Sequence, residues 1–468
     1  MKILLYAEPT IFAEATMNIP SLQLTRDYLW NMCGKSLSMN ENVELKFVIS
    51  EETYYQNIIT PVKGFLDDKN YIILRGEELI SIFEEGTSLL KIRQKIFLNR
   101  LSKEEEEKYK EYLYNKIMPF NPDVIILFPT HNKYINKLFP NAMVVNNENG
   151  MFSSRKPFMR TLRYEPFEYI NNFTNVFANE INRFPITQDM SDKVDKFRKE
   201  IIDIIDSNNP YKNKLIELKK QYKYLVLLPI ITDNIYKESF QDDEYTYVLN
   251  VLKRLPKDIG VIVTKHDFTN GMINERVIKF LQQKYANLIS FDCHKFVSFG
   301  APSLHFYKYV DAVINCMTGT GLLGTLWDTR IIANDKLYSH WFSDFVGLDN
   351  IENKLSSPIK NKNNMLYWYL THFIVFEKHF NEPNWYYNYF KNKLEKFRKD
   401  GITFELFEQI EDFDDISQYI INYVKNQYQQ KQPKKITFLQ KIFSVINEGK
   451  HKVLRIFGLK FKFRQKIG

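Results

Sequence analysis

A turn rich in threonine and glycine separates an expected strand from an expected helix in the second half of the chain. It consists of Thr318, Gly319, Thr320 and Gly321. Glycines let the backbone turn sharply, and the start of the following helix presents unpaired N–H groups and a positive dipole end. Hydroxyl and N–H donors of this kind suit the phosphate oxygens of a nucleotide. No lysine follows the glycines and no dinucleotide fingerprint is present, so ATP hydrolysis and NAD chemistry are disfavoured.

A second candidate is the pair Lys265 and His266, directly after the apolar run 261–263. Both side chains can hold a phosphate or diphosphate, and His266 can also donate a proton to it. Because such a pair is common on protein surfaces, the alternative to phosphate binding is that the two residues belong to a solvated turn. Its position one strand away from the threonine–glycine turn favours a shared donor site.

The third candidate is Glu148, within the polar segment 146–152 that ends the last strand expected in the first half. A carboxylate there can act as general base on an acceptor hydroxyl, or as nucleophile toward an anomeric carbon. Downstream, Arg155, Arg160 and Arg163 can pair with anionic sugar or phosphate groups. The alternative is an Asn/Gly turn that happens to contain a carboxylate.

The loop after the first expected strand contains Glu8 and Thr10. Such loops lie at the ligand-binding edge of parallel α/β sheets, so either side chain can contact an acceptor; a simple turn fits equally well. No His/Glu spacing typical of a metal site is present, so we expect neither metal nor cofactor. The acidic pairs at 242–243 and 414–415 are expected to be helix-start charges.

Alternating strands and helices predict the scaffold that positions these residues. Apolar runs typical of strands buried on both faces occur at Ile3–Ala7, Glu44–Ser50, Tyr71–Leu74, Asp123–Phe128, Ala142–Asn147, Tyr224–Ile230, Gly260–Thr264, Leu288–Phe291, Ala312–Cys316 and Arg330–Ala333. Helices are expected near Ser21–Met32, Glu77–Ile117, Glu244–Leu255, Asn274–Tyr285, Met365–Phe380, Trp385–Phe397 and Phe413–Tyr428. The run at 104–107 is expected to be a solvated helix face. Alternation of this kind favours doubly wound parallel sheets.

A chain of 468 residues is too long for one ordinary core. We predict a GT-B-like α/β architecture, in which two Rossmann-like domains face a cleft, followed by a helical C-terminal segment and a basic tail. Sugar epimerases and periplasmic binding proteins alternate similarly. The expected division is an acceptor domain at 1–185, a helical linker at 186–222, a nucleotide-sugar domain at 223–360, helices at 361–430 and an amphipathic tail at 431–468.

The basic charge is concentrated in this tail. Residues 431–468 hold eleven Lys or Arg and one acid, Glu448, whereas the whole chain has a net charge of +8. Apolar residues, many of them Phe and Leu, stand between those charges, and a stretch of this kind can lie at an anionic membrane surface. The alternatives are a terminal helix and strand packed on the body, or a solvated end. No nucleic-acid-binding module accompanies the charge, so we expect no nucleic-acid partner.

Cysteine usage and hydropathy indicate an intracellular protein. Cys33, Cys293 and Cys316 are scattered, which argues against a disulfide framework and a four-cysteine zinc site. Cys316 is expected to be a small buried hydrophobe. No run approaches the roughly 18 apolar residues of a membrane span, and the apolar start is too short for a signal peptide. We expect a cytoplasmic protein, peripheral at the inner face of the cytoplasmic membrane.

Several of these motifs together resemble one family. Lys265-His266, followed about fifty residues later by the threonine–glycine turn, is similar to a K-x-H-P…S-T-x-G-x-E-A pairing. Glu148-Asn-Gly-Met-Phe, with Lys156-Pro157 and Thr161-Leu162, is similar to an E-x-G-Y-x-R-P…T-L-E element. Both elements belong to bacterial capsule and lipopolysaccharide GT-B glycosyltransferases, the capsular Kdo-transferase group in particular. Asp267 stands where that group has proline, so the donor nucleotide stays open between CMP, UDP and GDP.

The resemblance implies a glycosyltransferase that moves a sugar from a nucleotide-sugar donor to a growing cell-surface polysaccharide, without a metal. It places the donor phosphates on Lys265, His266 and the threonine–glycine turn. It makes Glu148 and His266 the catalytic residues, with a glycan or lipid-linked acceptor in the first domain. A polymer phosphotransferase of the teichoic-acid type and a non-catalytic scaffold of polysaccharide assembly are the alternatives.

Overall fold

The computed structural model describes most of the chain. The described residues are 1–7, 23, 25–62, 65, 70–83, 87, 91–92, 95–96, 100–128, 132–153, 157–166, 172–230, 243–265, 273–291, 302–316, 318–335, 338–429, 443–448, 451–456 and 459–464.

Apolar segments of the first half assemble into one sheet. Its described strands are β1 (Lys2–Ala7), β2 (Glu44–Ser50), β3 (Tyr71–Leu74), β4 (Val124–Phe128), β5 (Met143–Ser153), β6 (Arg160–Glu165) and β13 (Val375–Phe376). They lie in the order β13-β6-β5-β4-β1-β2-β3. The five strands from β5 to β3 are parallel, and β6 and β13 add an antiparallel edge. Strands β1 and β4 are buried along nearly their whole length, as expected of parallel strands covered on both faces.

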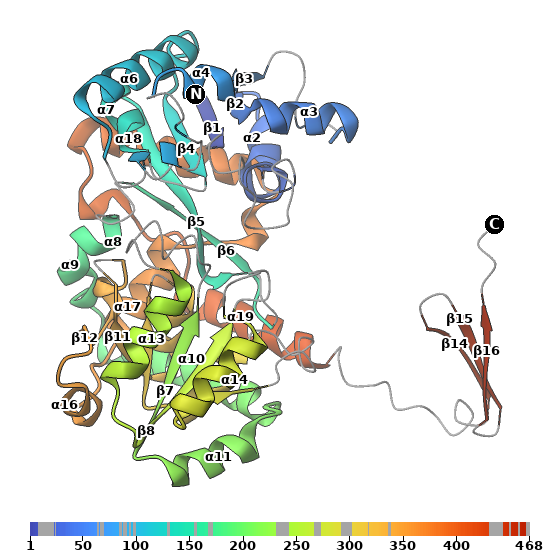
Figure 1. Cartoon of the computed structure of the whole chain (residues 1–468). Helices are drawn as coiled ribbons and strands as arrows, with labels where there is room; N and C mark the ends of the chain where they lie inside the picture. The colour runs from blue at the N-terminus through green and yellow to red at the C-terminus, as the bar shows by residue number, and fades with distance from the viewer. Residues whose placement is uncertain are drawn as a thin grey trace.

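The second half repeats this pattern with a parallel sheet. The described strands are β7 (Tyr224–Ile230), β8 (Ile259–Lys265), β9 (Leu288–Ser290), β10 (Ala312–Asn315), β11 (Arg330–Ala333) and β12 (Phe345–Val346). Their order is β12-β11-β10-β7-β8-β9. In both sheets the strand order reverses beside the first strand, between β1 and β4 and again between β7 and β10. Ligands bind beyond the carboxyl ends of strands at such points. The two halves are therefore Rossmann-like domains, and the predicted GT-B-like α/β fold is confirmed (Figure 1).

Helices cover these sheets and connect their strands. The described α-helices are α2 (Lys35–Ser38), α3 (Glu51–Ile59), α4 (Gly76–Ile80), α6 (Lys103–Ile117), α7 (Lys133–Leu138), α8 (Phe173–Val176), α9 (Ala178–Asn182), α10 (Gln188–Ser207), α11 (Lys212–Gln221), α13 (Glu244–Arg254), α14 (Glu275–Lys284), α15 (Gly319–Gly324), α16 (Ile351–Ser356), α17 (Asn363–Trp368), α18 (Pro383–Asp400) and α19 (Phe413–Gln429). The described 3₁₀- and π-helical segments are η2 (Arg26–Gly34), η4 (Pro302–His305), η5 (Tyr307–Tyr309), η6 (Thr325–Trp327), η7 (His340–Phe342), η8 (Tyr369–Phe373), η9 (Glu377–His379) and η10 (Phe404–Leu406).

The expected strands all form, and further strands were not expected. Strand β6 mixes charged and apolar residues, and β12 and β13 are only two residues long. Strand β13 interrupts the helix expected over Met365–Phe380, and the three strands between residues 443 and 464 were not expected either. The single helical stretch expected over 77–117 is divided: α4 and α6 are separate helices, and the described residues 91–92 and 95–96 between them are helical as well. The acidic run at 104–107 is not wholly solvated: Glu105 is 7% exposed, forms a capping box with Ser102 and binds Lys95. A carboxylate at the third position of a helix satisfies the backbone N–H of the capping residue, which explains its burial.

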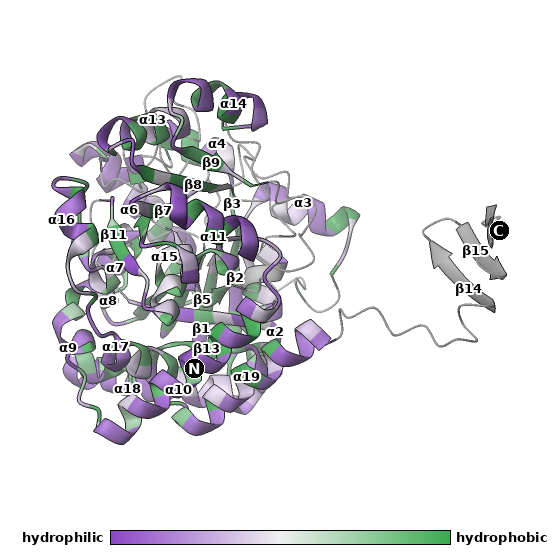
Figure 2. Ribbon diagram, turned by 90° about the horizontal axis from the view of Figure 1, so that it is seen from below, coloured by the Kyte–Doolittle hydropathy of each residue, from purple (hydrophilic) through white to green (hydrophobic). Residues whose placement is uncertain are grey.

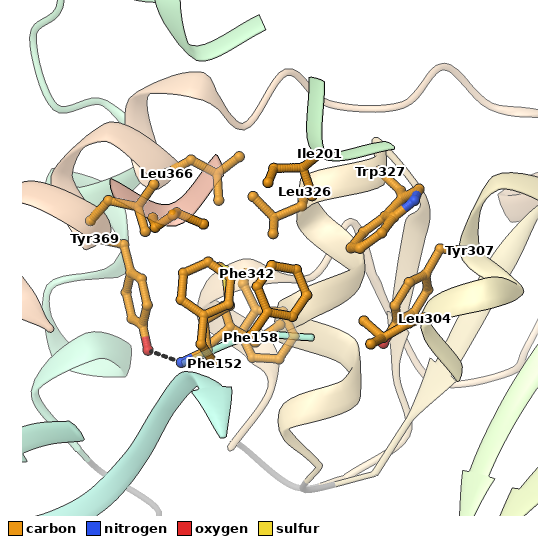
Figure 3. Packing of buried hydrophobic residues seen from close by; sticks show 14 of the residues in the cluster. Phe152, Phe158, Ile201, Leu304, Tyr307, Leu326, Trp327, Phe342, Leu366 and Tyr369 are labelled. Atoms are coloured by element: carbon orange, nitrogen blue, oxygen red, sulfur yellow. Dashed lines mark hydrogen bonds between the residues drawn. The ribbon is translucent and has the colours of Figure 1, made fainter. Parts of the chain in front are cut away.

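The C-terminal segment connects the two halves instead of packing on one. Helices α17 and α19 pack against α10, whereas β13 pairs with β6 and α18 covers the first sheet. Near the junction, one apolar cluster joins Phe152 and Phe158 of the first half to Leu326 of the second and to Leu366 and Tyr369 of the C-terminal segment (Figure 3). Shared burial of this kind favours a fixed arrangement of the two sheets.

Residues 431–468 contain a small sheet in their described part. Strands β14 (Phe443–Glu448), β15 (His451–Ile456) and β16 (Leu459–Arg464) pair antiparallel in sequence order. Figure 1 draws this sheet apart from the two larger ones. In Figure 2, helices on the outside of the body, such as α14 and α18, alternate hydrophilic and hydrophobic residues. No helix among the described residues has the length and apolar character needed to cross a bilayer. Cys33 and Cys316 are buried free thiols, as expected for Cys316, and Cys293 lies outside the described residues.

Arg198 on α10 holds the helical segment that follows the threonine–glycine turn. It is 4% exposed, and its guanidinium donates to the carbonyl oxygens of Thr325 (3.1 Å) and Leu326 (3.2 Å) and to Asn363 Oδ1 (2.9 Å). It also forms an ion pair with Asp328. One buried side chain therefore ties α10 to η6 and α17.

We predict that Arg198→Met lowers the free energy of unfolding by about 2–4 kcal/mol, because three buried acceptors lose their donor. Urea denaturation measures the change. Lys199→Met is the matched control: Lys199 is exposed on the same helix and pairs only with Asp203 in the described part of the chain, so its loss is expected to stay within about 0.5 kcal/mol. Equal losses in both variants would contradict the role of Arg198.

Candidate active site at the junction of the two sheets

Strand β5 brings Glu148 to the junction between the two halves. The strand continues beyond the expected end at Asn147 as far as Ser153, and α15 of the second half lies against it. Helix α15 begins directly after Thr318, so the structure brings the Glu148 segment and the threonine–glycine turn together although 170 residues separate them. Sequence spacing alone does not reveal this contact.

The carboxyl group of Glu148 has no hydrogen-bond or ion-pair partner among the described residues. The side chain is partly buried, and burial raises the pKa of this carboxyl from 4.5 to about 7. Arg163, directly opposite in the register of β5 and β6, opposes the shift without cancelling it. A carboxyl that titrates near neutral pH can gain or lose a proton during a reaction, as a general acid or base must.

Arg163 is held from both halves of the molecule. It is 3% exposed and forms an ion pair with Glu165 (3.0 Å), which in turn accepts from the N–H and hydroxyl of Thr174 (2.9 and 2.8 Å). From the second half, the Tyr338 hydroxyl accepts a hydrogen bond from Arg163 (2.7 Å), and the guanidinium lies 5.5 Å from the Tyr338 ring centre. The Arg163 guanidinium is already paired with Glu165 and bonded to Tyr338. Glu148 therefore has no ion-pair partner among the described residues, although a fixed positive charge lies across from it on β6.

The threonine–glycine turn is largely stabilised by its own polar groups. The Thr318 hydroxyl caps α15 by accepting from Thr320 N–H (3.2 Å), and Asn315 Oδ1 accepts from Gly321 N–H (3.1 Å). Asn315 also donates to the Ser339 hydroxyl (2.5 Å). The N–H groups of Thr320 and Gly321 therefore already have acceptors, which leaves the N–H of Gly319 as the donor of the turn best placed for a ligand.

The two glycines of the turn have different surroundings. A methyl group added at Gly321 would meet the Asn315 side chain at 2.4 Å, whereas one added at Gly319 would meet no described atom within 4 Å. Gly319 is also exposed. Gly321 is thus required for packing against Asn315, and Gly319 leaves open space above the start of α15.

The remaining predicted site residues divide into two groups. Glu8, Thr10, Arg155 and His266 lie outside the described residues, as does the side chain of Lys265, whose backbone ends β8. Arg160 is described, and it lies opposite Ser153, at the other end of β6 from Glu165. Its N–H donates to Glu377 (3.0 Å). Of the two arginines on β6, Arg163 is therefore the one across from Glu148.

Sequence reasoning missed the polar groups that hold this site together. Tyr338, Glu165 and Asn315 contribute to it from three separate elements, and none belongs to a recognisable motif. The signal available for Asn315 was a polar residue at the end of an otherwise apolar strand. Among the described residues, no group of three His, Cys, Asp or Glu side chains is arranged to hold a metal ion.

The strand orders define the class of fold, and the comparisons add structures that the chain resembles. No protein-family model and no curated protein sequence matches the chain. It is similar to the solved β-Kdo 2,7 transferase of Thermosulfurimonas dismutans KpsC, with 12% identity and a TM-score of 0.35 over 64% of this chain and 96% of that one. It is similar to the β-Kdo 2,4 transferase of the same protein, with 13% identity and a TM-score of 0.34 over 54% and 80% of the two chains. The UDP-GlcNAc 2-epimerase of Neisseria meningitidis, bound to UDP-GlcNAc, is similar with 11% identity and a TM-score of 0.27 over 91% and 100%.

We predict that Glu148→Gln stabilises the protein at pH 8 and not at pH 4. The folded-state pKa of Glu148, about 7, lies above its value of 4.5 in the unfolded chain. As pH rises between these values, the unfolded state releases the proton first, so Glu148 lowers stability progressively and the loss is complete above pH 7. A difference of this size between the two pKa values corresponds to roughly 3–4 kcal/mol, and denaturant unfolding at the two pH values measures it.

The control for this measurement is Glu180→Gln, at an exposed position on α9. It is expected to change the free energy of unfolding by less than about 0.5 kcal/mol at both pH values. An equal gain for Glu148→Gln at pH 4 and pH 8 would show that the titration of Glu148 is not the cause.

A second prediction concerns the two glycines of the turn. Gly321→Ala is expected to lower the free energy of unfolding by about 1–3 kcal/mol, because the new methyl group overlaps the hydrogen-bonded Asn315 side chain. Gly319→Ala is expected to change it by less than about 0.5 kcal/mol, because its methyl group enters open space. Thermal unfolding of both variants tests this difference, and a destabilised Gly319→Ala would contradict the open position of Gly319.

Proposed function

We propose that this chain is a nucleotide-sugar-dependent glycosyltransferase that extends a cell-surface polysaccharide. The observation that carries the proposal is the carboxyl group of Glu148. It has no partner among the described residues, burial raises its pKa to about 7, and it lies on the strand against which α15 of the second Rossmann-like half packs. A proton acceptor placed between two Rossmann-like halves suits a transfer from a nucleotide bound on one half to an acceptor bound on the other.

Glu148 would act as general base in this reaction. Its carboxylate takes the proton of an acceptor hydroxyl, the acceptor oxygen forms a bond to the anomeric carbon, and the bond from that carbon to the phosphate oxygen breaks. The nucleotide leaves with the electron pair. Arg163, fixed by Glu165 and Tyr338, favours the ionised form of Glu148 and so opposes the rise in its pKa that burial causes.

The donor would bind on the second half, at the switch point between β7 and β10. The open position of Gly319 lets a phosphate approach the backbone there. Lys265 ends the neighbouring strand β8, and His266 is the next residue in the sequence. Positive side chains and N–H groups would stabilise the charge of the departing nucleotide. CMP, UDP and GDP sugars all remain candidates for the donor.

We extend the proposal to the location of the enzyme. The tail at 431–468 combines eleven basic residues with many Phe and Leu residues, a composition suited to the anionic inner surface of the cytoplasmic membrane. A lipid-linked or membrane-proximal glycan acceptor is consistent with that position. Co-sedimentation of the full chain with anionic and with zwitterionic vesicles tests this part independently of activity.

The first test is donor binding. In a thermal-shift screen of CMP-, UDP- and GDP-sugars, at least one compound is expected to raise the melting temperature by mass action. Gly319→Glu is expected to abolish that rise, because its side chain fills the open space and repels phosphate, while the melting temperature without ligand stays unchanged. Gly319→Ala is the matched control and should retain binding. Absence of any shift across the panel would favour the non-catalytic scaffold.

The second test is the pH dependence of transfer with the donor so identified. Since Glu148 must be ionised, kcat/KM is expected to rise about tenfold per pH unit below pH 7 and to level off above it. Glu148→Gln is expected to lower kcat by about 10²–10⁴-fold with donor binding retained. A variant of near wild-type activity would exclude Glu148 as the base. Analysis of the product linkage separates a glycosyltransferase from a polymer phosphotransferase, which makes a phosphodiester.

A further inference from the structure

A cavity of about 300 Å³ lies at the edge of the second sheet opposite the proposed donor site. Asp311, which precedes β10, and Arg330, which begins β11, line it from the amino ends of these strands. Trp327 and Asp328, at the end of the helical segment α15–η6, line it as well. The cavity and the threonine–glycine turn are thus at opposite ends of one helical segment.

Arg330 is the unusual residue of this cavity. It is 6% exposed, and its terminal nitrogens donate to the carbonyl oxygens of Asp311 (2.9 Å) and Ser357. Its Nε has no hydrogen-bond partner, and among the described residues no carboxylate forms an ion pair with it. Withdrawing a guanidinium from water without a counter-charge is costly, so an anion placed here would offset that cost.

The two carboxylates that line the cavity have other partners. Asp311 accepts from Leu225 N–H (2.8 Å) and lies 3.5 Å from Lys219 Nζ. Asp328 forms an ion pair with Arg198. Neither is therefore available to neutralise Arg330.

The other cation that lines the cavity, Lys308, shares its carboxylate. Asp206 binds Lys308 (2.7 Å) and Lys212 (2.9 Å), and these lysines together with the Tyr309 hydroxyl lower its pKa to about 2. The Asp206 carboxylate thus stays ionised, and its single negative charge is shared between two ammonium groups. Arg330 is therefore the cation of the lining that has no ion-pair partner among the described residues.

The lining of the cavity combines apolar and polar side chains. The apolar ones are Ile202, Val310, Trp327, Leu355 and Ile359, and Tyr307, Lys308, Asp311, Asp328, Thr329 and Arg330 are polar or charged. A space of about 300 Å³ is at the small end of ligand sites, and apolar side chains beside a guanidinium that has no ion pair among the described residues favour a small ligand with an apolar part and an anionic group. We propose that this cavity binds a small organic oxyanion, a phosphate monoester or a carboxylate, with Arg330 as its counter-ion.

The test uses the full chain and three probes with the same ring: phenyl phosphate, phenylacetate and neutral benzyl alcohol, at matched ionic strength. Isothermal calorimetry is expected to show saturable binding of at least one anionic probe and none of benzyl alcohol. The anion that binds more tightly distinguishes a phosphate from a carboxylate ligand. Binding of benzyl alcohol with equal affinity, or of none of the three probes, would overturn the proposal.

Variants locate the binding. Arg330→Met is expected to raise the dissociation constant by about tenfold or more, equivalent to 1.4 kcal/mol. Arg254→Met, an exposed arginine of the same half paired with Asp349, is the control and should bind as the wild type does. If Arg330→Met does not fold, Ile359→Trp is the second variant. Its larger side chain narrows the opening of the cavity and leaves every charged side chain in place, so we expect it to weaken binding similarly. Unchanged affinity in the folded variants would exclude this cavity.

Gly319→Glu separates this site from the proposed donor site. It is expected to lose nucleotide-sugar binding and to bind the anionic probe normally, because Gly319 lies at the other end of α15–η6. Loss of probe binding in Gly319→Glu would place the probe in the donor site and overturn the second site. Failure of the donor screen leaves this experiment unaffected, since it requires no nucleotide.

Discussion

The hydrogen bond from Arg163 to Tyr338 is the polar contact on which the candidate active site depends. Arg163 belongs to the first half, where Glu165 holds it in an ion pair, and Tyr338 belongs to the second. The terminal nitrogens of Arg163 find partners in both halves, so both domains must be in place before these contacts form, whereas its Nε has no hydrogen-bond partner among the described residues. The apolar cluster that includes Phe152, Leu326 and Tyr369 supplies the burial around this contact. The surroundings of Glu148 therefore depend on how the two domains are arranged.

Burial at this junction has opposite consequences for stability and for chemistry. It raises the pKa of Glu148 to about 7, which disfavours the ionised form and lowers stability at neutral pH. The same shift gives a carboxyl group that can exchange a proton near pH 7. Arg163 reduces the free-energy cost of ionising Glu148 without forming an ion pair with it, because the Arg163 guanidinium is already paired with Glu165. A direct pair would stabilise the protein and remove the unpaired carboxyl.

Much of the scaffold was predictable from the sequence. Strands β2, β3, β7 and β11 have the expected bounds, because short apolar runs between polar loops are typical of strands in a parallel sheet covered on both faces. Strand β13 was not predictable, since its pairing with β6 depends on a C-terminal segment that returns to the first sheet. Strand β6 was missed because it mixes charged and apolar residues. The role of Glu105 was missed for a local reason: a capping box buries a carboxylate that composition assigns to solvent.

The sequence by itself determined the two Rossmann-like halves, the polar residues at the ends of their strands and the basic tail. Periodicity and composition encode these features, because each follows from residues close together in the chain. Only the tertiary structure decided that Arg163 rather than Arg160 lies across from Glu148, and that Gly321 is a packing residue and Gly319 an open one. It also decided that Arg330 is buried without an ion-pair partner in the part of the chain that the structure describes. These facts depend on strand register and on contacts between distant segments, which no local pattern specifies.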